Sequence, residues 1–315
     1  MKESKVSKIK ARFINRTSHW GLTGQRLRYF ITITSMVGFS LFGYDQGLMA
    51  SLITGKQFNY EFPATKENGD HDRHATVVQG ATTSCYELGC FAGSLFVMFY
   101  GERIGRKPLI LMGSIITIVG ATISTSAFRD YWALGQFIIG RVVTGVGTGL
   151  NTSTIPVWQS EMSKAENRGL LVNLEGSTIA FGTMIAYWID FGFSYINSSV
   201  QWRFPVSMQI VFALILFAFM INLPESPRWL ISQSRTEEAR YLVGTLDDAD
   251  PNDEEVVTEV AMLHDAVNRT KHESHSLSNL FSRGKSQNLQ RALIAASTQF
   301  FQQFTGCNAA IYYST

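Results

Sequence analysis

The sequence has few of the residue types on which secreted domains and metal centres depend. Its 315 residues include three cysteines and seven prolines, and only 17% of them are charged. Cys85, Cys90 and Cys307 all fall in apolar segments, so we expect small core residues and no disulfide framework, metal site or other cofactor. The N-terminus lacks a short apolar region with a small-residue cleavage site, which predicts no cleavable signal peptide. A net charge of +2 without a basic cluster gives no reason to expect a nucleic-acid partner.

Charge is also missing from long windows of the chain, and this segregation is typical of membrane proteins. About 20 apolar residues are needed to cross the hydrocarbon core of a bilayer. Six windows before residue 224 meet that length: 29–53, 76–100, 108–128, 132–155, 170–190 and 204–223. A seventh begins near Leu289 and runs to Thr315. The sequence therefore predicts an all-α polytopic membrane protein in contact with the lipid bilayer.

Small residues recur within these windows. Gly89 and Gly93 are four residues apart in the second window, and Gly145 and Gly149 are four apart in the fourth. Such pairs let helix backbones approach closely in lipid. We interpret both pairs as helix-packing positions.

The loops between the windows differ in basic residues. Those on the side of the N-terminus hold eight Lys and Arg in the tail, three after the second window, two after the fourth and seven after the sixth, whereas the opposite side holds five. Because basic loops stay in the cytoplasm, this bias predicts a cytoplasmic N-terminus.

The chain divides into four predicted parts. Residues 1–28 form a cytoplasmic tail, 29–230 a bundle of six transmembrane helices, 231–288 a cytoplasmic insert and 289–315 a seventh transmembrane helix that starts a second bundle. The insert has 11 acidic residues and helix-forming runs at 236–243 and 253–267. Its charge suits a solvated connector.

Four charged residues are the clear cases inside predicted spans. These are Asp45, Glu87, Arg141 and Glu175. An ionised group in the bilayer costs about 2.5–3.5 kcal/mol or more, so each needs a partner or a water-filled path. Asp45 and Arg141 can neutralise each other and form a proton switch, in which separation from the guanidinium favours the protonated carboxyl. Each of the four can also be a polar group with a purely structural role or one closer to the interface.

Five short strings then fall at characteristic places along the chain. They are GERIGRK at 101–107, Gly140-Arg141, the loop from Glu161 to Gly169, PESPRW at 224–229, and QQFTGCN at 302–308 followed by Tyr312 and Tyr313. Because the strings occur in this order and on these sides of the membrane, the chain resembles the sugar porter family of the major facilitator superfamily. Through residues 42–47 and 158–161, the chain also resembles fungal members that import glycerol with protons across the plasma membrane.

The resemblance implies a fold and a set of roles. It implies twelve spans in two bundles, of which this sequence supplies the N-terminal bundle and the first helix of the second. Asp45 and Arg141 match the proton-coupling pair. The family's substrate-binding positions correspond to Gln302, Gln303, Asn308, Tyr312 and Tyr313 in this sequence. The charged residues of the family's cytoplasmic gate correspond to Arg103, Arg106, Glu161, Arg168, Glu225 and Arg228.

The resemblance is incomplete at three positions. Glu102 replaces the usual aspartate, and Ala165 replaces a frequent proline. Gly176 stands where family members have a sugar-contacting glutamine, which favours a small uncharged polyol over a hexose and leaves protons as the coupling partner. A facilitative or proton-coupled hexose transporter and a non-transporting nutrient sensor remain alternatives. No nucleophile–base pairing or metal-ligand spacing supports an enzyme.

Overall fold

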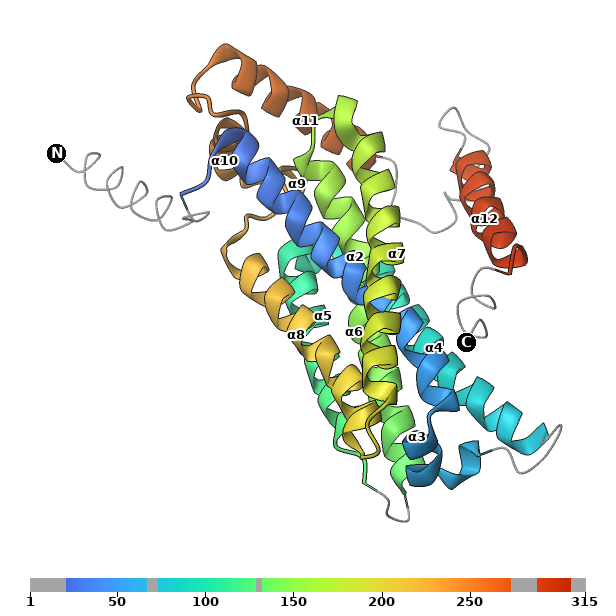
Figure 1. Ribbon diagram of the computed structural model, residues 1–315. Coiled ribbons are helices and arrows are strands. Elements are labelled where there is room, and N and C mark those ends of the chain that lie inside the picture. Colours follow the sequence, from blue (N-terminus) through green and yellow to red (C-terminus); the bar gives the residue numbers. More distant parts are fainter. Residues whose placement is uncertain (1–20, 67–72, 129–131, 273–287, 307–315) are drawn as a thin grey trace.

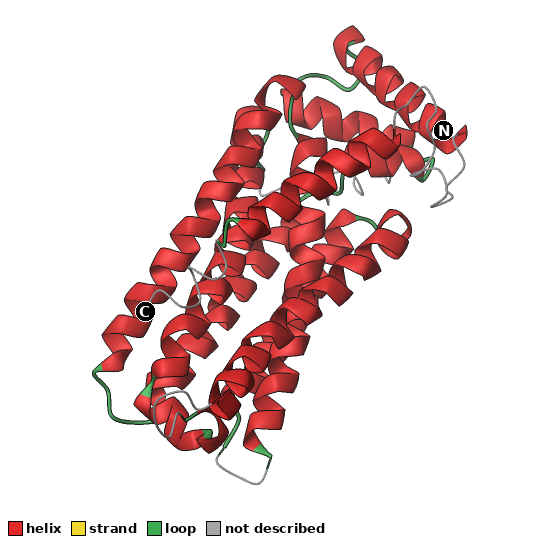
Figure 2. Ribbon diagram, turned by 90° about the vertical axis from the view of Figure 1, so that its right-hand side faces the viewer, coloured by secondary structure: helices red, strands yellow, loops and turns green. Residues whose placement is uncertain are grey.

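The computed structural model describes residues 21–66, 73–128, 132–272 and 288–306, and within these ranges the regular elements are all helices (Figures 1 and 2). Six long helices form one elongated bundle. They are α2 (Gly24–Thr54), α4 (Arg73–Ile104), α5 (Arg106–Thr125), α6 (Ala133–Met162), α7 (Arg168–Ser194) and α8 (Val200–Asn222). These helices coincide with the six windows expected from the sequence, so the six-helix bundle is confirmed.

Apolar length separates these helices into two groups. Among the described residues, α5, α6, residues 169–194 of α7 and α8 are long and apolar enough to cross a membrane. The other two, α2 and α4, have 31 and 32 residues but are more polar. Helix α2 contains Asp45, and α4 contains Glu87 and Glu102.

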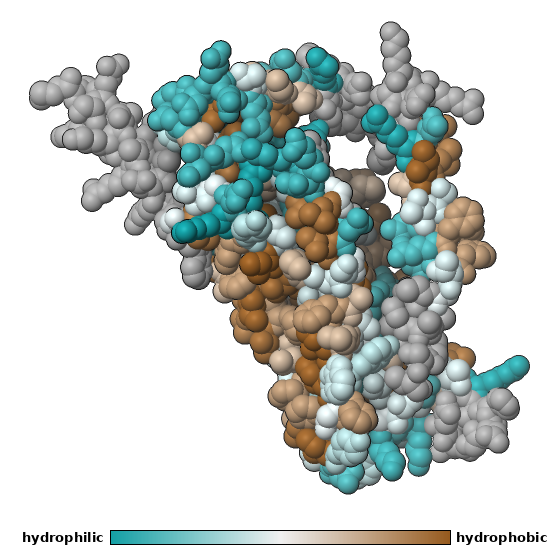
Figure 3. All heavy atoms as spheres, turned by 45° about the horizontal axis from the view of Figure 1, so that its top comes forward, coloured by the Kyte–Doolittle hydropathy of each residue, from teal (hydrophilic) through white to brown (hydrophobic). Residues whose placement is uncertain are grey.

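Shorter helices lie at the two ends of the bundle. One end carries α9 (Pro227–Ser232), α10 (Thr236–Asp247) and α11 (Glu254–His272), and we call it the insert end. The opposite end carries α3 (Lys56–Glu61) and η1 (Pro63–Thr65), which follow α2, and we call it the α3 end. The expected helical runs of the insert are confirmed by α10 and α11. Figure 3 shows hydrophilic residues gathered over the insert end and hydrophobic residues over the bundle helices.

Glycine sets the separation of α4 and α6. A Cβ atom added at Gly89 would collide with the carbonyl oxygen of Val142, and one added at Gly145 would collide with that of Tyr86. Gly93 and Gly149 make equally close approaches one turn further along the same pair of helices. The predicted packing role of these glycines is confirmed.

A second close seam joins α2 and α7. Gly43 faces the backbone of Ile179, Gly182 faces that of Ser40, and Gly47 meets Thr183. The hydroxyl of Thr183 donates a hydrogen bond of 2.9 Å across this seam to the carbonyl oxygen of Gly43. The two helices therefore run side by side with backbone nearly touching backbone.

The insert shares a hydrophobic core with the bundle. Leu27 and Ile31 of α2 belong to the same buried cluster as Leu242 and Leu246 of α10 and Val256 of α11. Arg28 reinforces this contact, because its guanidinium donates to the carbonyl oxygen of Leu246 at 3.1 Å and to the carboxylate of Asp247 at 2.7 Å. The insert is thus docked on the beginning of α2.

Four aromatic rings close the α3 end. Phe58 and Phe62 pack against Phe137 of α6 and Trp202 of α8, with ring centroids 4.7–6.1 Å apart. All four side chains are buried. This cluster anchors α3 to the bundle.

We predict that Gly145→Val will destabilise the bundle by about 1–3 kcal/mol, because the added side chain must push α4 away from α6. Gly192→Val is the matched control, since a Cβ atom at Gly192 of α7 has no neighbour within 4 Å. Unfolding of the purified protein in detergent micelles, followed by circular dichroism, measures both variants. Equal unfolding midpoints for the two would contradict the packing role of Gly145.

Candidate functional site

The first polar site is an ion pair in the middle of the bundle. Nη1 of Arg141, on α6, lies 2.6 Å from Oδ1 of Asp45, on α2. The side chains are 2% and 0% exposed, so the pair is shielded from solvent screening. The charges from two different helices thus come together as the sequence indicates.

The surroundings of this pair leave part of Asp45 open. Its second oxygen, Oδ2, has no hydrogen-bond partner among the described residues. The guanidinium of Arg141 also lies over the ring of Tyr86, with its Cζ atom 4.6 Å from the ring centroid. Tyr86 is itself fully buried. The carboxylate therefore shares one oxygen with the arginine and retains a lone-pair site on the other that can accept a proton.

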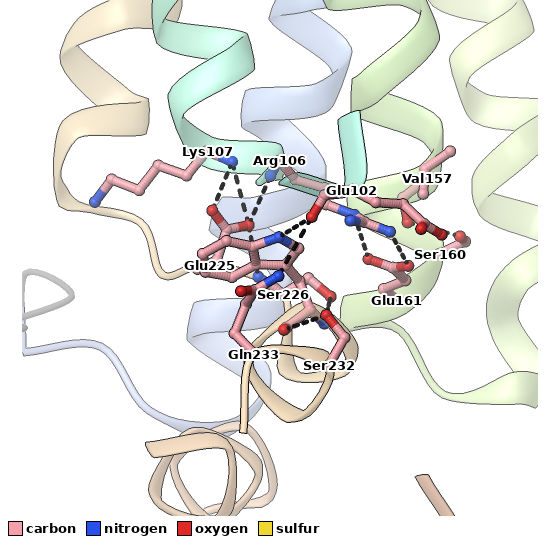
Figure 4. Close-up of polar contacts among 11 residues, drawn as sticks. Glu102, Arg106, Lys107, Val157, Ser160, Glu161, Glu225, Ser226, Ser232 and Gln233 are labelled. Carbon is pink, nitrogen blue, oxygen red and sulfur yellow. Dashed lines mark hydrogen bonds and ion pairs between the residues drawn. The ribbon is translucent and has the colours of Figure 1, made fainter. Parts of the chain in front are cut away.

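The second polar site lies at the insert end, where α5, α6 and the segment after α8 meet (Figure 4). Arg106 donates from Nε and Nη2 to the two carboxylate oxygens of Glu161, at 3.1 and 3.0 Å. This is the bidentate arrangement that fixes the orientation of both side chains. It ties the beginning of α5 to the end of α6.

Glu225 caps the first turn of α5 from another segment. Its carboxylate accepts hydrogen bonds from the backbone N–H groups of Arg106 and Lys107, at 3.0 and 3.1 Å (Figure 4). A carboxylate at a helix N-terminus satisfies free N–H groups and is favoured by the helix dipole. Burial raises the pKa of Glu225, and these backbone hydrogen bonds lower it. Gly105, with φ of 99°, makes the turn that presents both N–H groups.

The structure describes two of the other predicted residues of this site, and neither is brought into it. Arg103 and Arg228 are exposed. The side chain of Arg168 lies outside the described residues. Of the expected gate charges, the described structure therefore joins Arg106, Glu161 and Glu225.

The predicted substrate-binding positions lie on and after α12 (Asn288–Phe304), which stands beside the bundle in Figure 1. Gln302 and Gln303 are exposed on this helix. Asn308, Tyr312 and Tyr313 are outside the described residues. The structure thus places these glutamines away from the Asp45–Arg141 pair.

The two remaining charges within spans have different settings. Glu175 is 5% exposed, whereas Glu87 is half-buried. Gly176, next to Glu175, has nothing within 4 Å of its added Cβ position. This position therefore faces open space.

Sequence reasoning missed one buried carboxyl group. Asp190 of α7 is 5% exposed, and neither of its carboxylate oxygens has a hydrogen-bond partner among the described residues. The signal was available, because Asp190 is the last residue of the window 170–190 and the cost of a charge in the bilayer applies to it as well. The buried amide of Gln209 on α8, 1% exposed, was also missed.

Comparison with known proteins gives consistent results. The model of the family described as sugar (and other) transporter matches residues 30–315. Sugar transporter STL1 of Saccharomyces cerevisiae is 91% identical over 315 residues, which are all of this chain and 55% of that protein. Major facilitator superfamily transporter mfsA of Aspergillus fumigatus is 50% identical over 303 residues, or 95% of this chain and 56% of that protein. The chain spans about half the length of these curated relatives.

A solved structure shares the fold. The structure of the proton:xylose symporter XylE, a protein of E. coli, with bound 6-bromo-6-deoxy-D-glucose superposes with a TM-score of 0.77 at 21% identity, covering 91% of this chain and 61% of that one. The six-helix bundle is therefore the N-terminal half of a major facilitator fold.

We predict that the Asp45–Arg141 pair is coupled energetically. Arg141→Gln should destabilise the bundle by about 3–5 kcal/mol, because it leaves a buried carboxylate without its cation. The double variant Asp45→Asn, Arg141→Gln removes both charges and should lose less than this. The free energy of unfolding of the wild type, both single variants and the double variant in mixed detergent micelles gives the coupling energy. If the loss of unfolding free energy in the double variant equals the sum of the losses in the two single variants, the two side chains do not interact.

Proposed function

Since the chain belongs to the sugar transporter family, we propose that it supplies the N-terminal bundle of a transporter that imports a small polyol, with glycerol as the first candidate, by proton symport with alternating access. The protein acts in the plasma membrane with its N-terminus in the cytoplasm. The basic bias of the loops on the side of the N-terminus supports this orientation.

The observation that carries the proposal is the buried pair of Asp45 and Arg141. An ionised pair is stable while the two groups touch at 2.6 Å. When the bundle changes shape and the guanidinium moves away, the lone carboxylate becomes costly, and proton uptake neutralises it. Arginine stays protonated throughout, so Asp45 is the group that takes and releases the proton.

The cluster at the insert end provides the second element of alternating access. Arg106, Glu161 and Glu225 connect α5, α6 and the segment after α8. Charged contacts of this kind form and break as a unit, so they can favour one state of the transporter without blocking the other. We assign them to the cytoplasmic gate, and the exposed Arg103 and Arg228 then remain available for contacts with a second bundle.

Open space at Gly176 supports a small substrate. A position without a side chain supplies no amide to bind the ring hydroxyls of a hexose, whereas glycerol offers only three hydroxyl groups. The substrate-binding roles of Gln302, Gln303, Asn308, Tyr312 and Tyr313 belong to the same proposal. Amide and phenol groups can both donate to and accept from uncharged hydroxyls.

The first test concerns proton coupling. In a transport-competent protein that carries this sequence, Asp45→Asn should abolish alkalinisation of the medium on glycerol addition, because the titrating carboxyl is gone. Exchange of labelled glycerol down its gradient should persist, since the path for the solute remains. Asp265→Asn, at an exposed position of α11, is the control. Alkalinisation by Asp45→Asn at the wild-type rate would refute proton coupling through Asp45.

The second test concerns substrate size. Gly176→Gln adds an amide where the structure has room for it, so the protein should still fold and reach the membrane. Uptake of labelled glycerol should weaken, and uptake of glucose relative to glycerol should rise. The comparison needs both solutes in the same cells, which lack other carriers. A wild-type protein that takes up glucose as well as glycerol would favour the hexose alternative.

A further inference from the structure

A small cavity lies where the α2–α7 seam reaches the α3 end. Its volume is about 40 Å³, and its lining includes Ser51, Phe58, Asp190, Gln201 and Trp202. The seam leads directly to it. Gly47 of α2 packs against Thr183 and Ala186 of α7, and one helical turn later on each helix come Ser51 and Asp190. At this turn the close backbone packing gives way to a polar space.

Two buried polar groups on the cavity wall lack hydrogen-bond partners in the described part of the chain. One is the carboxyl group of Asp190, near which the hydroxyl of Ser51 lies. The other is the indole N–H of Trp202, whose side chain is 0% exposed. A carboxylate accepts hydrogen bonds and an indole N–H only donates. Water between them can accept from Trp202 and donate to Asp190, and 40 Å³ is enough for at least one water molecule.

The cationic groups on the elements around the cavity have other partners or are exposed. Of the groups on helices that pack against α7, Arg141 of α6 pairs with Asp45, and Arg203 of α8 donates to the carbonyl oxygen of Ala127 at 2.7 Å. Lys56 of α3 is exposed. Tyr44 of α2 is a further titratable group on these helices. In the described part of the chain no ion pair joins Asp190 to a cation, so a proton is the group that can neutralise its charge.

Tyr44 connects this carboxyl group to the ion pair. Its hydroxyl, fully buried, donates a hydrogen bond of 2.8 Å to the carbonyl oxygen of Pro205. Tyr44, which precedes Asp45 in the sequence, belongs to the same buried cluster as Trp202 of the cavity wall.

We propose that Asp190, with water held between it and Trp202, forms a second proton-binding site that collects protons at the α3 end and delivers them toward Asp45. In the binding step, a hydronium ion transfers its proton to a carboxylate oxygen of Asp190 and remains as water. The exposed Ser194 on the cavity rim gives access from the surface. The site itself stands on the cavity geometry, whereas its role in transport rests on the proposed proton symport.

Infrared difference spectroscopy tests the site without requiring transport. The purified protein is titrated with acid and base, and the C=O stretch of protonated carboxyl groups is followed. Asp190→Asn should remove one band that persists in the wild type near neutral pH, and Asp265→Asn should leave the spectrum unchanged. Trp202→Phe keeps the carboxyl but removes the N–H, and should displace the band. The Trp202→Phe variant also tests the site if the Asp190→Asn protein does not fold. Spectra of Asp190→Asn and Trp202→Phe identical to the wild type would overturn the proposal.

Transport then tests the role of the site. In a transport-competent protein carrying this sequence, Asp190→Asn should shift the external-pH midpoint of glycerol-driven proton uptake about one unit toward acid, because roughly tenfold more protons must then be supplied from solution. Asp190→Glu should restore most of the wild-type profile. A profile for Asp190→Asn that superposes on the wild type would overturn the role in proton delivery. If the wild type takes up no protons with glycerol, the proposed symport fails, and the infrared band still decides whether the site exists.

Discussion

Close contact between helix backbones, which glycine permits, is the constraint on which the rest of the structure depends. Lipid provides no hydrophobic drive for helices to associate, so packing and polar contacts have to hold them together. Gly89 and Gly145 bring α4 against α6, and Gly43 and Gly182 bring α2 against α7. The Asp45–Arg141 ion pair, with atoms 2.6 Å apart, then joins these two helix pairs, because Asp45 is on α2 and Arg141 is on α6. The ion pair therefore links the two glycine seams.

The polar sites differ in how their charges are balanced. Asp45 is balanced by a cation from another helix, and Glu225 by the N–H groups at the start of α5. Asp190 lines a cavity together with Trp202. Hydrogen bonds from N–H groups favour the ionised form of a carboxylate, which suits a structural contact, whereas a carboxylate with only water beside it has no fixed partner for its charge. The roles proposed above, as a switch, a latch and a proton collector, correspond to these differences.

Much of this arrangement follows from the sequence because its signals are local or sterically demanding. The six helices were predicted from apolar length, and the packing of Gly89 and Gly145 from their spacing. The Asp45–Arg141 pair was predicted from the cost of isolated charge in lipid. The remaining features depend on tertiary geometry. Nothing local indicates that Arg103 stays exposed while Arg106 binds Glu161, since both arginines belong to the same turn. The cavity beside Asp190 requires the register between α2 and α7.

The contact between Arg28 and Asp247 has a consequence for the order in which the protein is assembled. These residues are 219 positions apart, and the ribosome makes about 5–20 residues per second. Helix α2 thus waits on the order of ten seconds or more for the segment that docks on its beginning. During that time Leu27 and Ile31 have no insert to cover them. The beginning of α2 therefore reaches its finished surroundings only after the insert has been made.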